Sequence, residues 1–324
     1  MKYGFIFPGQ GSQYLGMGKD FYEKYPLARE MFERAETLIK VPLKKVIFED
    51  EKMLNNTKYT QPSIFLISAI ILNILGLEVT FEKEPSIVAG HSLGEWTATL
   101  ASGALNFDDT LDLIYYRAKF MNDAAPEGFG GMTALIGLSK LEDKYSFYNM
   151  VKETLEEEKK EVYIANFNAY NQIVISGKLG DLEYIEDVFR KKGVRRVVRL
   201  KVSGPFHTPF MKKAADKLLN IMNKRDFKDG LIPIISNVDA EPTLFSNEIK
   251  DKLYKQIFSP VNWVQVVEKI KEMDINLLFE IGPKNVLKNL VKRIAPEIEV
   301  INIEKVEDLE KVIPIIEKIN KGEI

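Results

Sequence analysis

The hydrophobic positions of the chain form short, nearly continuous apolar runs, separated by longer stretches with helical periodicity. The apolar runs are "KYGFIF", "SIVAG", "IPIISN", "NLLFEI" and "EVINIE". Stretches such as "NVLKNLVKRI" and "DLEKVIPIIEKI" repeat their apolar residues at the spacing of one helix face. Apolar runs without polar alternation are typical of strands buried on both faces, as in a parallel sheet. The pattern therefore predicts an α/β fold around a mainly parallel sheet.

The order of the predicted elements changes between Gly131 and Val202. This region contains strand "GMTALIGL", a charged helix ending near "ETLEEEKK", strands "VYIAN" and "QIVISG", helix "DLEYIEDVFRKK" and strand "VRRVVRLKV". The order β-α-β-β-α-β is that of a ferredoxin-like unit. We therefore expect a small ferredoxin-like domain at residues 129–201, inserted into a larger domain made of residues 1–128 and 202–324.

Charge and composition exclude several classes of protein. The 324 residues include 45 Lys and Arg against 47 Asp and Glu, a formal net charge of -2 that gives no broad electrostatic basis for binding nucleic acid or membranes. Cysteine is absent, which excludes disulfides, thiolate metal sites and a cysteine nucleophile. The apolar run from Ile64 to Leu77 is interrupted by Ser68 and Asn73, so we expect a buried helix rather than a membrane span. The start "MKYGFIFPGQ" lacks the apolar stretch of a signal peptide, and we expect a cytoplasmic protein.

A glycine-rich loop, "PGQGSQYLGMG", follows the first predicted strand. A dinucleotide-binding fingerprint would require glycine where Tyr14 stands, and a Walker loop would require lysine where Met17 stands. What remains is a loop at the carboxyl end of a strand, where α/β folds place ligand-contacting groups such as Gln10 and Gln13. A plain tight turn is the alternative.

The stretch "AGHSLGEW" places Ser92 between the predicted strand "SIVAG" and the predicted helix "EWTATLASG". This is the context of a nucleophile elbow, in which a strained turn lifts a serine hydroxyl above the sheet. Gly90 and Gly94 leave room for such a turn, and the amide of Leu93 at the helix start can face developing negative charge. We therefore predict that Ser92 is a nucleophile.

A serine nucleophile needs a base, and the chain contains only two histidines. His91 is adjacent to Ser92, so its side chain should diverge at the sharp turn, and we expect a local structural role for it. His207 lies in "VSGPFHTPFM", on a loop leading into a helix, from which it can be brought over the serine. His207 is therefore the candidate base.

Eight motifs together resemble those of malonyl-CoA:acyl carrier protein transacylases and of the acyltransferase domains of polyketide synthases. They are "FPGQGSQYLGMG", "TQPSIF", "GHSLGEW", "YYRAKFM", "GMTALIG", "ANFNAYNQIVISG", "GPFHTPFM" and "KQIFSPVNW", and they extend over about residues 1–295. The resemblance implies an α/β-hydrolase-like large domain and a ferredoxin-like small one, in agreement with the element pattern.

The resemblance also implies roles for particular residues. Ser92 would carry the malonyl group as an ester and His207 would be its base, with no carboxylate completing a triad. The backbone carbonyl at Gln256 would orient His207, and the amides of Gln10 and Leu93 would form the oxyanion hole. The acyl donor is a substrate, and no cofactor or metal is expected.

Substrate selectivity is assigned to two further residues. Arg117, 25 residues after Ser92, would bind the free malonyl carboxylate as a bidentate pair. Phe206 beside His207, together with Leu93, goes with malonyl rather than methylmalonyl substrates in this family. Packing alone is the alternative role for Phe206.

An acyl carrier protein is acidic, so its docking surface should be basic. The densest basic stretch is "RKKGVRRVVRLK", residues 190–201. We expect docking on a basic rim that includes Lys191, Arg195, Arg196, Lys284 and Lys288. A solvated strand edge is the alternative for this stretch.

The expected function is transfer of malonyl from malonyl-CoA to a carrier thiol for fatty acid synthesis. An acyltransferase serving a polyketide synthase and a serine esterase are the alternatives. An esterase usually supplies an acidic residue between serine and histidine and has no need of Arg117. A catalytically inactive binding module would usually have lost Ser92 or His207, and the chain contains both.

Overall fold

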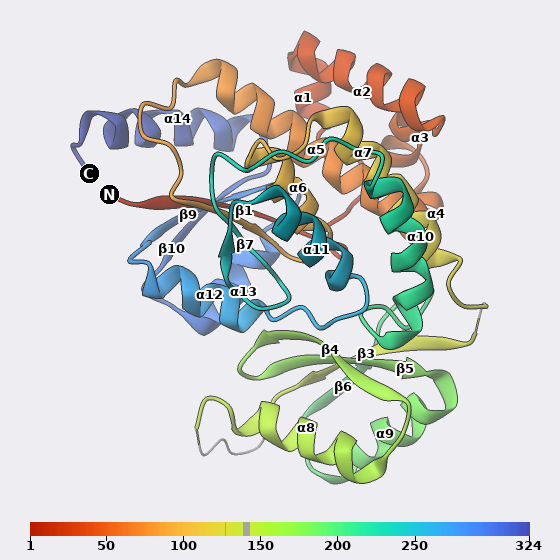
Figure 1. Cartoon of the computed structure of the whole chain (residues 1–324). Coiled ribbons are helices and arrows are strands. Elements are labelled where there is room, and N and C mark those ends of the chain that lie inside the picture. The colour runs from red at the N-terminus through yellow and green to blue at the C-terminus, as the bar shows by residue number, and fades with distance from the viewer. Residues whose placement is uncertain (127, 139–142) are drawn as a thin grey trace.

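The chain folds around two sheets, one above the other in Figure 1. The computed structural model describes residues 1–126, 128–138 and 143–324. The upper sheet has the order β10-β9-β1-β2-β7-β8, and its neighbouring strands are parallel except for the β7–β8 pair. Its strands are β1 (Tyr3–Phe7), β2 (Ile87–Gly90), β7 (Ile234–Ile235), β8 (Pro242–Thr243), β9 (Leu277–Ile281) and β10 (Glu299–Ile303). The prediction of an α/β fold with a mainly parallel sheet is confirmed.

Helices cover both faces of this large sheet (Figure 1). Those on the α5 side are α1 (Lys19–Lys24), α2 (Pro26–Ile39), α3 (Leu43–Phe48), α4 (Glu51–Leu54), α5 (Thr57–Glu78), α6 (Leu93–Ala101), α7 (Phe107–Asn122), α10 (Lys212–Met222) and α14 (Val306–Lys321). The short η1 (Pro209–Met211) and α11 (Ser246–Gln256) pack into the same core cluster as α5, whereas α12 (Trp263–Glu272) and α13 (Val286–Ile294) pack into the cluster of the opposite face. Strand β1 is buried on both faces. Phe5 and Phe7 pack into the core cluster on the α5 side of the sheet, and Ile6 packs into the cluster on the opposite side.

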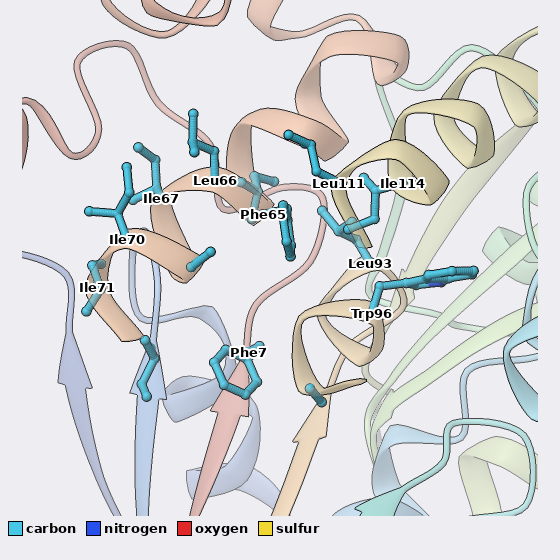
Figure 2. Packing of buried hydrophobic residues seen from close by; sticks show 14 of the residues in the cluster. Phe7, Phe65, Leu66, Ile67, Ile70, Ile71, Leu93, Trp96, Leu111 and Ile114 are labelled. Carbon is cyan, nitrogen blue, oxygen red and sulfur yellow. The ribbon is translucent and has the colours of Figure 1, made fainter. Parts of the chain in front are cut away.

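Helix α5 is the buried helix that the apolar run predicts. It is long and apolar enough to cross a membrane, but 78% of its apolar window is buried inside the protein. Figure 2 shows Phe65 of α5 lying between Phe7 of β1 and Leu111 of α7, close to Leu93 of α6. Because α6 begins directly after Ser92, this packing fixes the helix that carries the predicted nucleophile.

The lower sheet is antiparallel, with the order β4-β5-β3-β6. Its chain order is β3 (Gly130–Ile136), α8 (Ser146–Glu158), β4 (Val162–Ala169), β5 (Gln172–Lys178), α9 (Leu179–Lys191) and β6 (Arg196–Arg199). Helices α8 and α9 lie on the face away from the large sheet (Figure 1). A bridge between Asn166 of β4 and Val261, just before α12, joins the two parts of the chain.

Two predicted strands are shorter than their apolar runs. In "IPIISN" only Ile234 and Ile235 pair, because Asn237 turns toward β2 and its side chain donates to the carbonyl of Gly90 (2.7 Å). In "VRRVVRLKV" the strand ends at Arg199. After Arg199 the chain leaves the small sheet, and Leu200 and Val202 line a cavity.

Candidate active site

Ser92 lies in a tight turn between β2 and α6, as the elbow motif predicts. Its φ is 52°, in the left-handed region that residues other than glycine rarely adopt. The flanking glycines are required by close backbone contacts: a Cβ on Gly94 would lie 2.0 Å from the carbonyl oxygen of Phe7, and one on Gly90 would lie 2.0 Å from the carbonyl carbon of Gly94. The sequence thus forms a strained turn that presents the Ser92 hydroxyl at the carboxyl end of the sheet.

Neighbouring strands bring further groups to this edge. Gln10 follows β1, Ser92 follows β2 and Asn237 follows β7, and these strands are adjacent in the sheet. Asn237 Oδ1 accepts a hydrogen bond from the Ser92 amide (2.7 Å), so it holds the strained peptide in place. The site therefore lies where parallel α/β sheets place their ligands.

Ser92 and His207 are in direct contact. Ser92 Oγ lies 2.8 Å from His207 Nε2, and His207 Nδ1 lies 2.9 Å from the carbonyl oxygen of Gln256. A carbonyl only accepts, so Nδ1 carries the proton of that bond and the neutral ring offers an unprotonated Nε2 to the serine hydroxyl. Burial, assisted by the charge of Arg117, lowers the pKa of His207 to about 3. At neutral pH the imidazole is therefore in the form that accepts a proton.

This lowered pKa predicts a measurable pH dependence of stability. Between the folded pKa of about 3 and the unfolded value of about 6.5, the unfolded state binds a proton at His207 that the folded state does not. The free energy of unfolding should therefore fall on acidification below about pH 6.5, by up to about 1.4 kcal/mol per pH unit from this group. Urea unfolding of wild type and His207→Gln should show the wild-type curve descending more steeply. Parallel curves would contradict the assignment.

Arg117 extends from α7 into the same cluster and is 1% exposed. Its Nη2 donates to Ser92 Oγ and to Gln256 Oε1, both at 3.0 Å, and its Nη1 donates to Gln61 Oε1 at 2.5 Å. Burial lowers its pKa to about 9, opposed by the charge of Glu95, so the guanidinium remains charged at neutral pH. Its Nε finds no acceptor among the described residues. The guanidinium is thus a buried positive charge beside the nucleophile with donor capacity to spare.

The two predicted oxyanion-hole residues face one cavity of about 140 Å³ that also contains Ser92 and His207. The Gln10 side chain is held by Thr57, since Nε2 donates to Thr57 Oγ1 (3.1 Å). Leu93 is the first residue of α6, where backbone amides lack partners within the helix. Neither the Gln10 nor the Leu93 amide donates to another group in the described part of the chain. Both amides are therefore available to an oxyanion.

The cavity lies between the two sheets. The small sheet contributes Met132, Asn166, Asn168 and Val174 to its lining. Phe206 is buried and lines the cavity. Within residues 1–126, 128–138 and 143–324, His, Asp and Glu side chains form no group of three that could hold a metal ion.

His91 is directed away from the serine. Its Nε2 lies 2.7 Å from Asn168 Oδ1 of β4, and its ring lies 5.7 Å from that of Trp263. This geometry agrees with the structural role expected for His91, which links the elbow to the small sheet.

Sequence reasoning missed three side chains of this cluster: Gln61, Glu95 and Asn237. Gln61 and Glu95 stand inside quoted motifs, "TQPSIF" and "GHSLGEW", and Asn237 ends the run "IPIISN". A polar residue inside a short apolar run or a motif is the one sequence feature that could have pointed to these side chains. Their partners, however, lie 56 to 161 residues away along the chain.

The predicted basic residues lie on both parts of the chain, Lys284 and Lys288 beside the large sheet and the other three beside the small one. Lys284 Nζ donates to the carbonyl of Gly11 (3.3 Å), next to Gln10, and Lys288 is exposed on α13. Arg196 is the first residue of β6 and pairs with Ile136 of β3. On its other side Ile136 pairs with Gln172 of β5, whose side-chain oxygen accepts a hydrogen bond from Arg293 of α13 (2.9 Å). The other two are exposed: Lys191 at the end of α9, and Arg195 just before β6.

Comparisons with known proteins identify the family. The family model described as acyl transferase domain matches residues 4–314. The malonyl CoA-acyl carrier protein transacylase of Bacillus subtilis (strain 168) is 37% identical over 323 residues, 98% of each chain. That of Escherichia coli (strain K12) is 35% identical over 294 residues, 90% of this chain and 93% of the relative.

Solved structures agree. The malonyl CoA-acyl carrier protein transacylase from Clostridium perfringens has a TM-score of 0.88 at 35% identity, covering 99% of both chains. A malonyl-transacylase in complex with its type II PKS acyl-carrier protein has a TM-score of 0.89 at 33% identity, covering 97% of this chain and 99% of that one. The chain therefore belongs to the acyl transferase domain family, among the malonyl CoA-acyl carrier protein transacylases.

Proposed function

We propose that this protein transfers the malonyl group from malonyl-CoA to the phosphopantetheine thiol of acyl carrier protein, supplying fatty acid synthesis. One observation carries the proposal: Ser92 Oγ lies between a neutral imidazole and a buried guanidinium, 2.8 Å from His207 Nε2 and 3.0 Å from Arg117 Nη2. The first group activates a nucleophile, and the second binds an acyl group that ends in a carboxylate.

In the first half-reaction, Ser92 Oγ attacks the thioester carbonyl of malonyl-CoA while its proton passes to His207 Nε2. The carbonyl oxygen becomes an oxyanion, which the amides of Gln10 and Leu93 stabilise. Collapse of the intermediate breaks the carbon–sulfur bond, and His207 returns the proton to the departing CoA thiolate. Malonyl-Ser92 remains, with its carboxylate paired to Arg117.

In the second half-reaction, the carrier thiol gives its proton to His207 and attacks the ester carbonyl of malonyl-Ser92. The same two amides stabilise the second oxyanion, and the proton returns to Ser92 Oγ as the ester bond breaks. The carbonyl of Gln256 holds His207 in one tautomer through both steps, so no carboxylate is needed beside the imidazole.

The proposed architecture is an α/β-hydrolase-like domain, residues 1–128 and 202–324, with a ferredoxin-like domain inserted at residues 129–201. The β-α-β-β-α-β order and the strand order β4-β5-β3-β6 support the second assignment. Residues 139–142 of the small domain lie outside the described residues. We also propose a cytoplasmic location and catalysis without a cofactor or metal.

Intact mass spectrometry tests the proposed function. Wild type mixed with malonyl-CoA should gain the mass of one malonyl group, and addition of carrier protein should remove it. Ser92→Ala should gain none, because the ester has no oxygen on which to form. An unmodified wild type, or an adduct that forms on Ser92→Ala, would contradict the mechanism. Rapid hydrolysis of simple esters without transfer would favour an esterase, and transfer only to a polyketide carrier would favour that alternative.

The basic rim is the proposed carrier-docking surface, defined as Lys191, Arg195, Arg196, Lys284 and Lys288. Charge reversal of exposed Arg196 and Lys288 together should raise the KM for carrier protein by about tenfold at low salt, and less at high salt. Loading from malonyl-CoA should change much less. Lys318→Glu, at an exposed position on α14, is the control. An unchanged KM for carrier protein in the double variant would exclude this surface.

A further inference from the structure

Glu95 is a buried acid that the steps above do not use. It stands on the first turn of α6, three residues after Ser92, and is 2% exposed. Its Oε2 accepts from Gln256 Nε2 (2.7 Å) and from the amide of Asn237 (3.2 Å). Burial raises its pKa to about 7. A buried acid is costly, and this one contacts the two residues that hold the Ser92 peptide.

Gln256 connects Glu95 to the reacting groups. Its Nε2 donates to the carbonyl of Ser92 (2.7 Å) as well as to Glu95, and its Oε1 accepts from Arg117 Nη2 (3.0 Å). A primary amide keeps its shape when turned over, but its donor and acceptor ends exchange places. A turned-over Gln256 would present an NH2 group to the Arg117 donors, and the two would repel.

Glu95 and the Ser92 carbonyl together determine which way round this amide lies. A backbone carbonyl and an ionised carboxylate only accept, so the end of Gln256 that faces them must be the NH2 group, and Oε1 must then face Arg117. The three acceptors of Arg117 are uncharged. Glu95 does not contact the guanidinium directly; the Gln256 amide lies between them and is hydrogen-bonded to both. That charge also opposes the lowering of the Arg117 pKa by burial.

We propose that Glu95 is a positioning residue: through Gln256 it holds the Arg117 guanidinium where it meets the acyl carboxylate, and it thereby maintains selectivity for malonyl over acyl groups that lack a carboxylate. This inference rests on the proposed function, in which Arg117 pairs with malonyl.

The test compares loading of Ser92 from malonyl-CoA and from acetyl-CoA. For Glu95→Ala, the kcat/KM for malonyl should fall by at least about thirtyfold, mainly through KM, while that for acetyl changes by less than about threefold. The malonyl-to-acetyl ratio should therefore fall at least about tenfold. Glu95→Gln should recover the ratio to within about fivefold, because its amide oxygen can still accept from Gln256. An unchanged ratio in Glu95→Ala, or no recovery in Glu95→Gln, would overturn the proposal.

Glu280→Ala is the matched control for loss of a buried acid. Glu280 is also fully buried, has a pKa raised to about 7 by burial, and accepts from the amides of Leu287 and Lys288 (both 2.8 Å) away from the cluster. Its removal should lower stability and leave the malonyl-to-acetyl ratio unchanged. If the malonyl-to-acetyl ratio of Glu280→Ala falls as far as that of Glu95→Ala, then loss of any buried acid lowers the ratio, and the proposal is overturned.

A double-mutant cycle establishes whether Glu95 acts through Gln256. Adding Glu95→Ala to Gln256→Ala should change the ratio by less than about twofold, because the connecting amide is already gone. Effects that multiply would overturn the proposal. Failure of the proposed function would appear differently, as a wild type that forms no malonyl adduct at all.

Discussion

Replacing His207 with alanine should slow malonyl loading of Ser92 by about 10⁴-fold or more, which is the range seen when a nucleophile loses its base. The reason is the 2.8 Å contact between Ser92 Oγ and Nε2: without it the hydroxyl keeps its proton and remains a weak nucleophile. Stopped-flow or quenched-flow mass spectrometry of the first half-reaction measures this rate directly, before any carrier protein is added.

The second histidine provides the control. His91 is half-buried and contacts Asn168 rather than the serine, so His91→Asn should slow loading by less than about tenfold while lowering stability. Circular dichroism of both variants checks that each is folded. A folded His207→Ala that loads within about tenfold of wild type, or a His91→Asn that is slowed equally, would exclude His207 as the base.

Replacing Arg117 with alanine should reduce kcat/KM for malonyl-CoA by about 10²- to 10³-fold and abolish the preference over acetyl-CoA. A buried, hydrogen-bonded charge pair that loses one partner costs about 3 to 4 kcal/mol, because the other charge stays unpaired. Acetyl loading should be unchanged or faster, since the acetyl group has no carboxylate to pair and no longer leaves a buried guanidinium unpaired. Kinetics of loading with both donors measure the two effects.

Arg117→Lys separates charge from geometry. A lysine keeps the positive charge but cannot donate as a planar fork, so we expect it to retain preference for malonyl with a KM raised about tenfold or more. Equal loading of malonyl and acetyl by wild type, or an unaltered preference in Arg117→Ala, would contradict the assigned carboxylate site.

Much of the fold follows from local pattern. Strands β1, β2, β9 and β10 lie within the runs that predict them, and β1, β2 and β9 are buried along their whole length, which favours apolar residues. Strand ends are predicted less well where a partner that is distant in the sequence fixes them. β7 stops after Ile235 because Asn237 is drawn to Gly90 and Ser92, and the apolar run itself contains no sign of that contact.

The candidate site divides in the same way. The elbow around Ser92 is local, since its glycines are required by contacts within a few residues and with the adjacent strand. His207 is the candidate base because the chain has only two histidines, and the position of His91 next to the serine argues against His91 in that role. Arg117 has no distinguishing mark among 45 basic residues, and only the resemblance assigned it a role.

The α/β pattern, the strained serine turn and a short set of possible bases follow from the sequence alone, because they depend on periodicity, local sterics and residue counts. The fold brings together groups that are far apart along the chain: Ser92 with His207 across 115 residues, and Gln256 with Ser92, Glu95 and Arg117 across 139 to 164 residues. Hydrogen bonds between residues so far apart in the sequence depend on how the packed helices and sheets bring the ends of loops together. The number of residues between two groups does not encode their distance in space, so the polar network around Glu95 is visible only in the fold.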